Sequence, residues 1–269
     1  LIQFTELIVK AQNRRRKTPR TGELKFDAEF SNRFSVFTEK FLGLILIFWF
    51  VLHQGKMNRK QIIKMNILDK IVIDKRKEVN LKKELIPFEA FEMLPFFDRK
   101  TISLSKKLRG SVTGIIAEFK RKSPSKSIIN NTAKVEDVVI GYEQAGVCGI
   151  SVLTDEIYFG GTLDDLISAR ENCILPLLRK EFIIDEYQIL EAKAFGADVI
   201  LLIAAILTKK EIKQFSELAK SLNLDVLLEV HNKEELNKSV MPSLDMLGVN
   251  NRNLKTFEVS LETSKSLST

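Results

Sequence analysis

The sequence predicts an α/β fold, a parallel sheet made of six strand–helix units, which is six of the eight units of a (β/α)8 (TIM) barrel. From residue 113 onward, short apolar runs of strand length alternate with longer amphipathic stretches. Alternation of this length produces right-handed βαβ units and therefore a parallel sheet. The composition, 45% hydrophobic and 29% charged over 269 residues, is that of a globular protein with a sizeable core.

The expected strands are nearly continuous apolar runs, as is typical of strands buried on both faces of a parallel sheet. They are Gly114–Phe119, Gly149–Thr154, Leu175–Lys180, Val199–Ala205, Asp225–Val230 and Met246–Asn250. An eight-stranded barrel needs about 250 residues, and the stretch from Met65 to Thr269 is shorter than that. We therefore expect a barrel that is two units short, with two open sheet edges.

The expected helices lie between these strands. They are Val135–Ala145, Leu163–Asn172, Glu186–Phe195, Lys209–Leu222, Lys233–Val240 and the start of one at Ser260. The tetrapeptide "FGAD", which begins at Phe195, indicates a helix end followed by a strand start. In "LTKKEI", Thr208 and Glu211 have the spacing of a capping box, which favours a helix start at that point.

A charged helical segment, Asn66–Leu108, precedes the first strand. Its apolar residues Ile67, Leu68, Ile71 and Val72 have helical spacing. We expect residues 65–110 to form an N-terminal helical extension laid on the barrel, and residues 111–269 to contain strands one to six.

Residues 1–64 differ from the rest of the chain. They carry a net charge of +8 and the remainder −1, which together make the overall +7. The apolar run Phe41–Leu52 is too short for the roughly 20 residues that span a bilayer. We expect an atypical leader outside the enzyme fold, with a natural start at Met65; a membrane anchor and a partner-binding helix are the alternatives.

The charge and the cysteines exclude several classes of protein. Because the excess of basic residues is confined to the leader, the remainder gives no case for nucleic-acid binding. Cys148 and Cys173 belong to no metal-binding motif and are expected to be small core residues in a reducing, cytoplasmic protein. With only His53 and His231 besides, a zinc site is not expected.

Charged and polar side chains gather where four of the expected strands end. Residues i and i+2 of a strand face the same side, and barrel enzymes keep their chemistry at the carboxyl ends of the strands. The residues on this rim are Glu118, Lys120, Lys180, Glu229, Asn250 and Arg252. An inward salt-bridge network that only stabilises the barrel is the alternative, but buried ion pairs stabilise poorly. His231 is set aside as a supporting or surface residue.

Five blocks of sequence carry a resemblance to a known family. They are "IIAEFKRKSPSK", "AGVCGISVLTDEIYFGGTLDDL", "LPLLRKEFIIDEYQILEAKAFGADVILLIAAIL", "LLEVHNKEEL" and "LGVNNRNLKTFEVSLETS". Together, in this order and spacing, they resemble indole-3-glycerol phosphate synthase of tryptophan biosynthesis. The resemblance covers Met65 to the last residue, and "MNILDKIVIDKRKEV" is similar to the usual beginning of that family.

The resemblance implies a carboxy-lyase that closes the indole ring of 1-(2-carboxyphenylamino)-1-deoxyribulose 5-phosphate, without metal or organic cofactor. It implies that Lys180 is the general acid at the substrate carbonyl. Glu229 would serve the proton transfers of dehydration, and Lys120 would lie near the substrate carboxylate. Glu118 and Asn250 would orient these groups and hold the sugar hydroxyls.

The resemblance also implies four substrate-binding residues. Ser123 and Arg252 would line the carboxylate or hydroxyl side, and Phe159 and Phe182 would form walls around the anthranilate ring. The partner is then a small phosphorylated molecule, with neither nucleic acid nor membrane.

The last residues, "LETSKSLST", fall inside the expected sixth helix. The seventh and eighth strands of the family, with the loops that bind the phosphate, are expected beyond them, and the 269-residue chain is expected to be inactive by itself. One alternative stays open at this point, a non-enzymatic remnant or interaction protein, associated with membranes through Phe41–Leu52. A phosphosugar isomerase fits less well, because such enzymes lack the ring of two lysines and two glutamates.

Overall fold

The computed structural model describes residues 66–252 and 258–268. The expected leader, including Phe41–Leu52, lies outside these residues. The described chain begins with helix α4 (Ile67–Leu85), capped by Asn66, whose side chain accepts a hydrogen bond from the Asp69 N–H at 2.9 Å. Two short helices follow, α5 (Glu89–Glu92) and α6 (Leu104–Arg109), so the expected helical extension is confirmed within its described part.

Six strands form one parallel sheet in the order β1-β2-β3-β4-β5-β6. Their bounds are β1 Ile116–Phe119, β2 Gly149–Leu153, β3 Leu177–Lys180, β4 Val199–Ile203, β5 Asp225–Val230 and β6 Met246–Val249. Each strand pairs with its neighbour in sequence, so β1 and β6 are the edges of the sheet among the described residues. The predicted α/β class, strand order and sheet edges are therefore confirmed.

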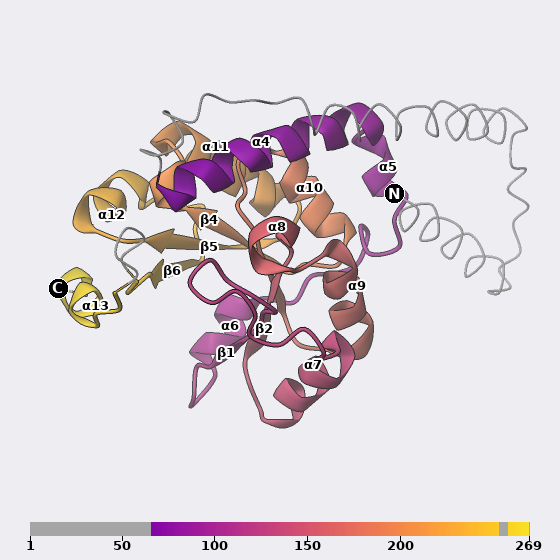
Figure 1. Cartoon of the computed structure of the whole chain (residues 1–269), viewed down its shortest axis with the longest axis horizontal. Coiled ribbons are helices and arrows are strands. Elements are labelled where there is room, and N and C mark those ends of the chain that lie inside the picture. The colour runs from indigo at the N-terminus through magenta and orange to yellow at the C-terminus, as the bar shows by residue number, and fades with distance from the viewer. Residues whose placement is uncertain (1–65, 253–257, 269) are drawn as a thin grey trace, which may run out of the picture. The chain divides into compact units, whose positions relative to one another are not determined.

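Helices follow the strands as expected (Figure 1). Their bounds are α7 Val135–Gln144, α8 Glu156–Phe159, α9 Leu163–Asn172, α10 Tyr187–Ala194, α11 Lys209–Ser221, α12 Lys233–Ser239 and α13 Glu262–Leu267. The capping box at Thr208 and Glu211 starts α11. After α10 the chain turns at Gly196, whose φ of 93° suits a residue without Cβ.

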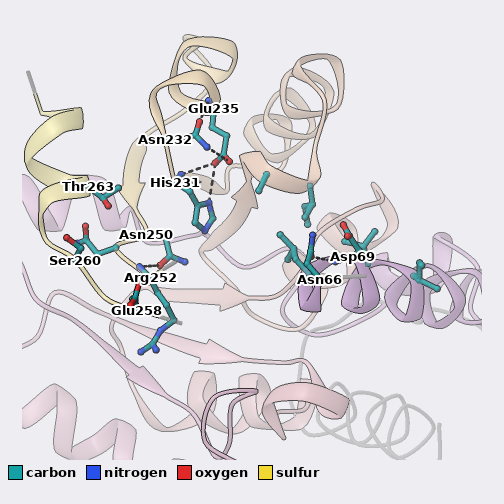
Figure 2. Close-up of a pocket in the computed structure, with 16 residues that line it drawn as sticks. Asn66, Asp69, His231, Asn232, Glu235, Asn250, Arg252, Glu258, Ser260 and Thr263 are labelled. Carbon is teal, nitrogen blue, oxygen red and sulfur yellow. Dashed lines mark hydrogen bonds and ion pairs between the residues drawn. The ribbon is translucent and has the colours of Figure 1, made fainter. Parts of the chain in front are cut away.

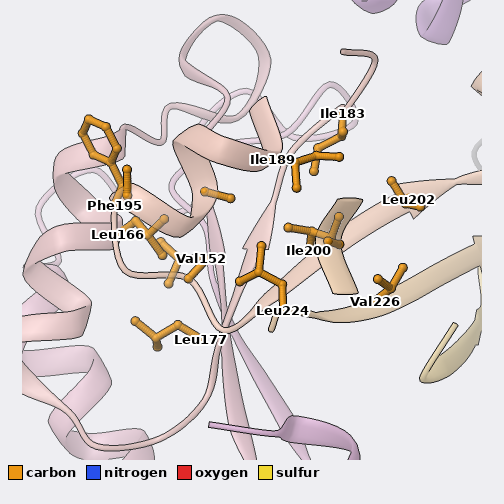
Figure 3. Packing of buried hydrophobic residues seen from close by; sticks show 14 of the residues in the cluster. Val152, Leu166, Leu177, Ile183, Ile189, Phe195, Ile200, Leu202, Leu224 and Val226 are labelled. Carbon is orange, nitrogen blue, oxygen red and sulfur yellow. The ribbon is translucent and has the colours of Figure 1, made fainter. Parts of the chain in front are cut away.

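The two faces of the sheet bury different sets of apolar side chains. Between the sheet and the helices lies the larger cluster, part of which Figure 3 shows: Val152, Leu177, Ile200, Leu202 and Val226 pack against side chains such as Leu166, Ile189 and Phe195. The alternate strand residues form a second cluster on the opposite face, with Leu178, Leu201 and Ile203 at its centre. The polar rim at the carboxyl ends of the strands therefore lies on this second face of the sheet.

The buried aspartate Asp198 connects the N-terminal segment to the amino ends of the strands. Asp198, fully buried before β4, accepts hydrogen bonds from the Arg99 and Arg170 side chains at 2.7 and 2.9 Å. It also accepts the backbone N–H of Ile102 and of Leu177, at 2.8 and 2.9 Å. Because these bonds satisfy a buried carboxylate from several elements, they order the end of the sheet opposite the polar rim.

Two short elements were not predicted. The expected strand Val199–Ala205 ends at Ile203, and the chain continues as a single 3-10 turn, η1 (Ala204–Ile206). Helix α8 has only four residues, so the sequence periodicity could not reveal it. In the part of the chain that the structure describes, every helix is too short or too polar to cross a membrane.

Candidate active site

A continuous chain of polar contacts crosses the rim at the carboxyl ends of the strands. Lys120 Nζ lies 2.6 Å from Glu118 Oε1, and Lys180 Nζ lies 3.4 Å from the other oxygen of the same carboxylate. Lys180 Nζ is also 3.9 Å from Glu229 Oε2. Asn250 donates a hydrogen bond to Glu229 Oε1 at 2.9 Å. Two ammonium groups thus alternate with two carboxylates over four strand ends, and all five side chains reach one place.

The strand geometry explains this convergence. Glu118 points to the same face as Ser151 of β2, its register partner, whose hydroxyl lies 3.5 Å from it. Lys180 is the last residue of β3, Glu229 is the penultimate residue of β5, and Asn250 follows β6. Because parallel strands end at one edge of the sheet, residues far apart in sequence become neighbours.

The electrostatics of the cluster keep Glu118 ionised. Burial by itself raises the pKa of this carboxyl, but Lys180 and Lys120 lower it by more, so its pKa lies below the ordinary value. The side chain is 30% exposed, and both lysines are about equally exposed, so the cluster is open to a ligand from solution. An anionic Glu118 between two lysines can orient both ammonium groups toward a substrate.

A cavity of about 530 Å³ lies over this rim. All nine side chains that the sequence suggested as site residues line it: Glu118, Lys120, Ser123, Phe159, Lys180, Phe182, Glu229, Asn250 and Arg252. The size is within the range of small-molecule sites. The structure therefore brings these residues together, while the role of each stays a prediction.

Aromatic side chains bound one side of the cavity. The rings of Phe159, in α8, and Phe182, after β3, have centroids 5.9 Å apart and are tilted by 40°. Helix α8 ends at Gly160, which has a left-handed φ of 66°. Leu153, Leu201 and other apolar side chains complete the lining, so the cavity combines apolar walls with charged groups. This combination suits a flat aromatic ring that carries a carboxylate.

The loop after β1 is held by its own ion pair. Arg121 forms a two-pronged contact with Asp165 of α9, in which Nη2 donates to Oδ1 at 2.8 Å. Ser123 and Lys126 exchange backbone hydrogen bonds of 2.8 and 3.1 Å, which close a tight turn over the cavity. Within this loop, Arg121 is therefore structural, whereas Lys120 and Ser123 face the cavity.

A second and larger cavity, of about 850 Å³, lies beside the first and shares Leu68, Asn250 and Arg252 with it. Figure 2 shows His231 there, with its Nδ1 3.2 Å from Glu235 Oε2. Its Nε2 is 3.8 Å from Glu229 Oε1. Because the cluster of lysines and glutamates and the aromatic wall line the smaller cavity, we assign the candidate site to it despite the difference in size.

Helix α4 contributes residues that sequence reasoning missed. Ile67, Leu68 and Ile71 line the cavity, which the helical spacing of these apolar residues alone could not show. Lys75 is buried one turn further along the helix. Its contacts with Asp155 and Glu181 are not signalled by any spacing in the sequence.

Comparisons with known proteins agree with the geometry. A family model described as indole-3-glycerol phosphate synthase matches residues 68–269. A protein of that name from Bacteroides thetaiotaomicron is 45% identical over 199 residues, which cover 74% of this chain and 76% of that protein. One from Neisseria gonorrhoeae is 43% identical over 206 residues, 75% of this chain and 79% of that protein.

Among solved structures, the carboxyl transferase domain of Rhizobium etli pyruvate carboxylase aligns with 68% of this chain and 33% of that chain. Its sequence identity of 12% and TM-score of 0.38 are too low to carry an argument. The family model and the close relatives are decisive, because they cover most of the described fold, including the whole polar rim. The chain belongs to the indole-3-glycerol phosphate synthase family.

Proposed function

We propose that this protein catalyses the ring closure of 1-(2-carboxyphenylamino)-1-deoxyribulose 5-phosphate to indole-3-glycerol phosphate, with release of one carbon dioxide and one water. The carbon of the aromatic ring that bears the carboxylate attacks the ketone carbon of the sugar chain. Loss of carbon dioxide from that ring carbon restores the aromatic system. The new hydroxyl then leaves as water, and a proton is lost from the methylene carbon beside the nitrogen.

The first step needs an acid at the ketone oxygen. We assign this role to Lys180, because it lies between two carboxylates, 3.4 Å from Glu118 and 3.9 Å from Glu229. Both carboxylates contact its ammonium group, which lines the cavity. Protonation of the ketone oxygen by Lys180 prevents a full negative charge from developing as the carbon–carbon bond forms.

The dehydration needs a group that moves protons on the other side of the cluster. We assign it to Glu229, whose Oε1 is held by the Asn250 amide at 2.9 Å while Oε2 faces Lys180. An oxygen with a fixed partner orients the carboxylate and leaves the other oxygen available for proton transfer. Asn250 also has a second amide hydrogen that can bind a sugar hydroxyl.

The remaining residues bind the substrate. Lys120, paired with Glu118 at 2.6 Å, is placed to attract the substrate carboxylate and to share the acid work of Lys180. Ser123 and Arg252 line the polar part of the cavity, and Phe159 and Phe182 the aromatic part.

Free, buried Cys148 and Cys173 suit a reducing compartment, and we place the enzyme in the cytoplasm.

The observation that carries this proposal is the Lys120–Glu118–Lys180–Glu229–Asn250 chain at the edge of a cavity with an aromatic wall. The test uses a protein that starts at Met65 and continues after Thr269 with two further βα units of the family. We expect it to form indole-3-glycerol phosphate and carbon dioxide in equal amounts.

The same assay on the 269-residue chain tests whether it is inactive by itself, as proposed from the sequence. If the extended protein binds the substrate normally but forms no indole product, the proposed function is wrong, and a non-enzymatic role takes its place.

A further inference from the structure

Lys75 is a buried cation on the inner face of α4. Its side chain is 2% exposed, and its ammonium group contacts three carboxylates. Glu78 Oε2 lies at 2.7 Å, Asp155 Oδ2 at 3.0 Å and Glu181 Oε1 at 3.1 Å. Burial by itself lowers the pKa of Lys75, but Glu181, Glu78 and Asp155 raise it by more, so the side chain stays charged.

Asp155 connects this cation to the first aromatic wall. Its other oxygen, Oδ1, accepts the backbone N–H of Tyr158 at 2.7 Å and of Phe159 at 3.2 Å, and so caps α8. The carboxylate is thus divided between Lys75 and the start of the helix that carries Phe159. A neighbouring hydrogen bond also joins α8 to α4: the Tyr158 hydroxyl donates to Asp74 of α4 at 2.6 Å.

Glu181 connects the same cation to the second aromatic wall. Its Oε1, 3.1 Å from Lys75, also accepts the N–H of Phe182 at 2.8 Å. Its Oε2 accepts the Thr154 hydroxyl at 2.9 Å, which joins the residues that directly follow β2 and β3. Glu181 stands between Lys180, the proposed general acid, and Phe182 in the sequence. The position of its side chain therefore affects the positions of both the Lys180 ammonium group and the Phe182 ring.

Stability alone explains this arrangement poorly. Buried ion pairs are often no better for stability than apolar side chains of the same volume. Here a single ammonium lies between the segments that carry Phe159 and Phe182, whose rings lie 5.9 Å apart at the cavity. A cation bound to one carboxylate on each segment, Asp155 and Glu181, can set the separation of those segments, which an apolar side chain could not do.

We propose that Lys75 is a positioning residue that holds the Phe159 and Phe182 segments at the spacing the substrate's aromatic ring requires. The proposal rests on the proposed function for the identity of the ligand, but the spacing itself can be tested without it. Misplacement of binding groups by about 1 Å can cost about 10²-fold in rate, so the expected effect is large for a residue that does not touch the substrate.

The first experiment measures hydrogen exchange in the 269-residue protein and needs no ligand. Lys75→Met keeps the side-chain stem and removes the charge. The matched control is Lys83→Met, on the same helix, where an exposed lysine pairs with Asp185 at 3.0 Å. We expect at least about tenfold faster exchange at the Tyr158, Phe159 and Phe182 amides in Lys75→Met, with β4 and β5 unchanged. The proposal is overturned if exchange becomes faster throughout the protein, or if it becomes no faster at these three amides.

The second experiment separates positioning from stability. Lys75→Met leaves excess negative charge, and the double variant Lys75→Met/Glu181→Gln removes one of those charges. We expect the double variant to recover most of the lost melting temperature. Its local exchange at the three amides should stay fast, because the cation that joins the two segments is still missing. Recovery of slow exchange along with the melting temperature would show a purely electrostatic stabilising role and overturn the proposal.

The link to the substrate is tested with the extended protein described above. The fluorescence of the aminobenzoate ring gives the affinity for the substrate, and turnover gives kcat and KM. We expect Lys75→Met to lower kcat/KM by about 10²-fold, and Lys83→Met to leave it unchanged. If wild type neither binds nor converts the substrate, the proposed function is wrong. The hydrogen-exchange result still tests whether Lys75 fixes the spacing of the Phe159 and Phe182 segments. If wild type is active and Lys75→Met is equally active, the positioning role is refuted.

Discussion

The buried carboxylate of Glu191 forms ion pairs with Arg179 of β3 and with Lys82. The effect of its removal on the free energy of unfolding can be calculated. Glu191 Oε2 lies 2.5 Å from Arg179 Nη2, and Oε1 lies 3.1 Å from Lys82 Nζ. Arg179 is fully buried and directly precedes Lys180. Burial raises the pKa of Glu191, but Lys82 and Arg179 lower it by more, to about 2, from an ordinary value of 4.5. The folded state therefore favours the ionised carboxylate.

The sign and size of the pH dependence follow from this shift. A depressed pKa contributes stability that is fully present above the unfolded-state value and is lost as pH falls toward the folded-state value. At about 1.4 kcal/mol per unit, the Glu191 contribution is about 3 kcal/mol at pH 7, of which about 2 kcal/mol is lost by pH 3. Glu191→Gln removes this contribution, takes away the 2.5 Å partner of the buried Arg179 and leaves Lys82 with Glu78 only, so we expect a loss of about 3–5 kcal/mol at pH 7.

Urea unfolding, followed by circular dichroism at several pH values from 7 to 3, measures the effect. Other carboxylates titrate in the same range in both proteins, so the informative quantity is the difference between wild type and Glu191→Gln. We expect that difference to shrink by about 2 kcal/mol between pH 7 and pH 3. Glu217→Gln, at an exposed surface pair, is the control and should differ little from wild type. A Glu191→Gln difference that is the same at every pH would refute the reasoning.

Three further predictions concern the site and its support. Asn250→Ala removes the hydrogen bond to Glu229, and we expect kcat of the extended protein to fall about tenfold with little change in KM. A Cβ at Gly161 would overlap a strand backbone carbonyl oxygen, so Gly161→Ala should lower the melting temperature by several degrees or prevent folding. Gly141→Ala, in open space on α7, should be neutral or stabilising by comparison. A version of the extended protein that begins at Leu1 should have the same melting temperature and turnover as the one that begins at Met65, because the family match begins at residue 68; loss of folding without residues 1–64 would show that they are part of the enzyme.

Much of the fold followed from local patterns. The strand Asp225–Val230 and the helix Leu163–Asn172 have the predicted bounds, because apolar runs and helix caps mark both ends. Other strands were predicted one or two residues too long, as at Gly114–Phe119, where β1 begins at Ile116. Apolar composition continues past the last paired residue, so it cannot define where hydrogen bonding between strands stops.

The site was predictable where strand ends carry unusual residues. A glutamate or lysine at the end of an apolar strand indicated Glu118, Lys180 and Glu229, and all three meet at the rim. Lys75 was not predictable, because a lysine in a charged helix is normally exposed. Its burial arises from Asp155 and Glu181, about 80 and 106 positions later in the chain, and only tertiary structure brings them together.

The acid–base role of the rim cluster is tested most directly by turnover of the extended protein with and without Lys180. Wild type and Lys180→Ala are given 1-(2-carboxyphenylamino)-1-deoxyribulose 5-phosphate, and indole-3-glycerol phosphate is followed by its absorbance. Lys213→Ala, at an exposed surface pair, is the matched control. We expect Lys180→Ala to bind the substrate but to turn it over at least about 10²-fold more slowly, as is typical for the loss of a positioned acid. A Lys180→Ala variant as fast as wild type would contradict the assignment.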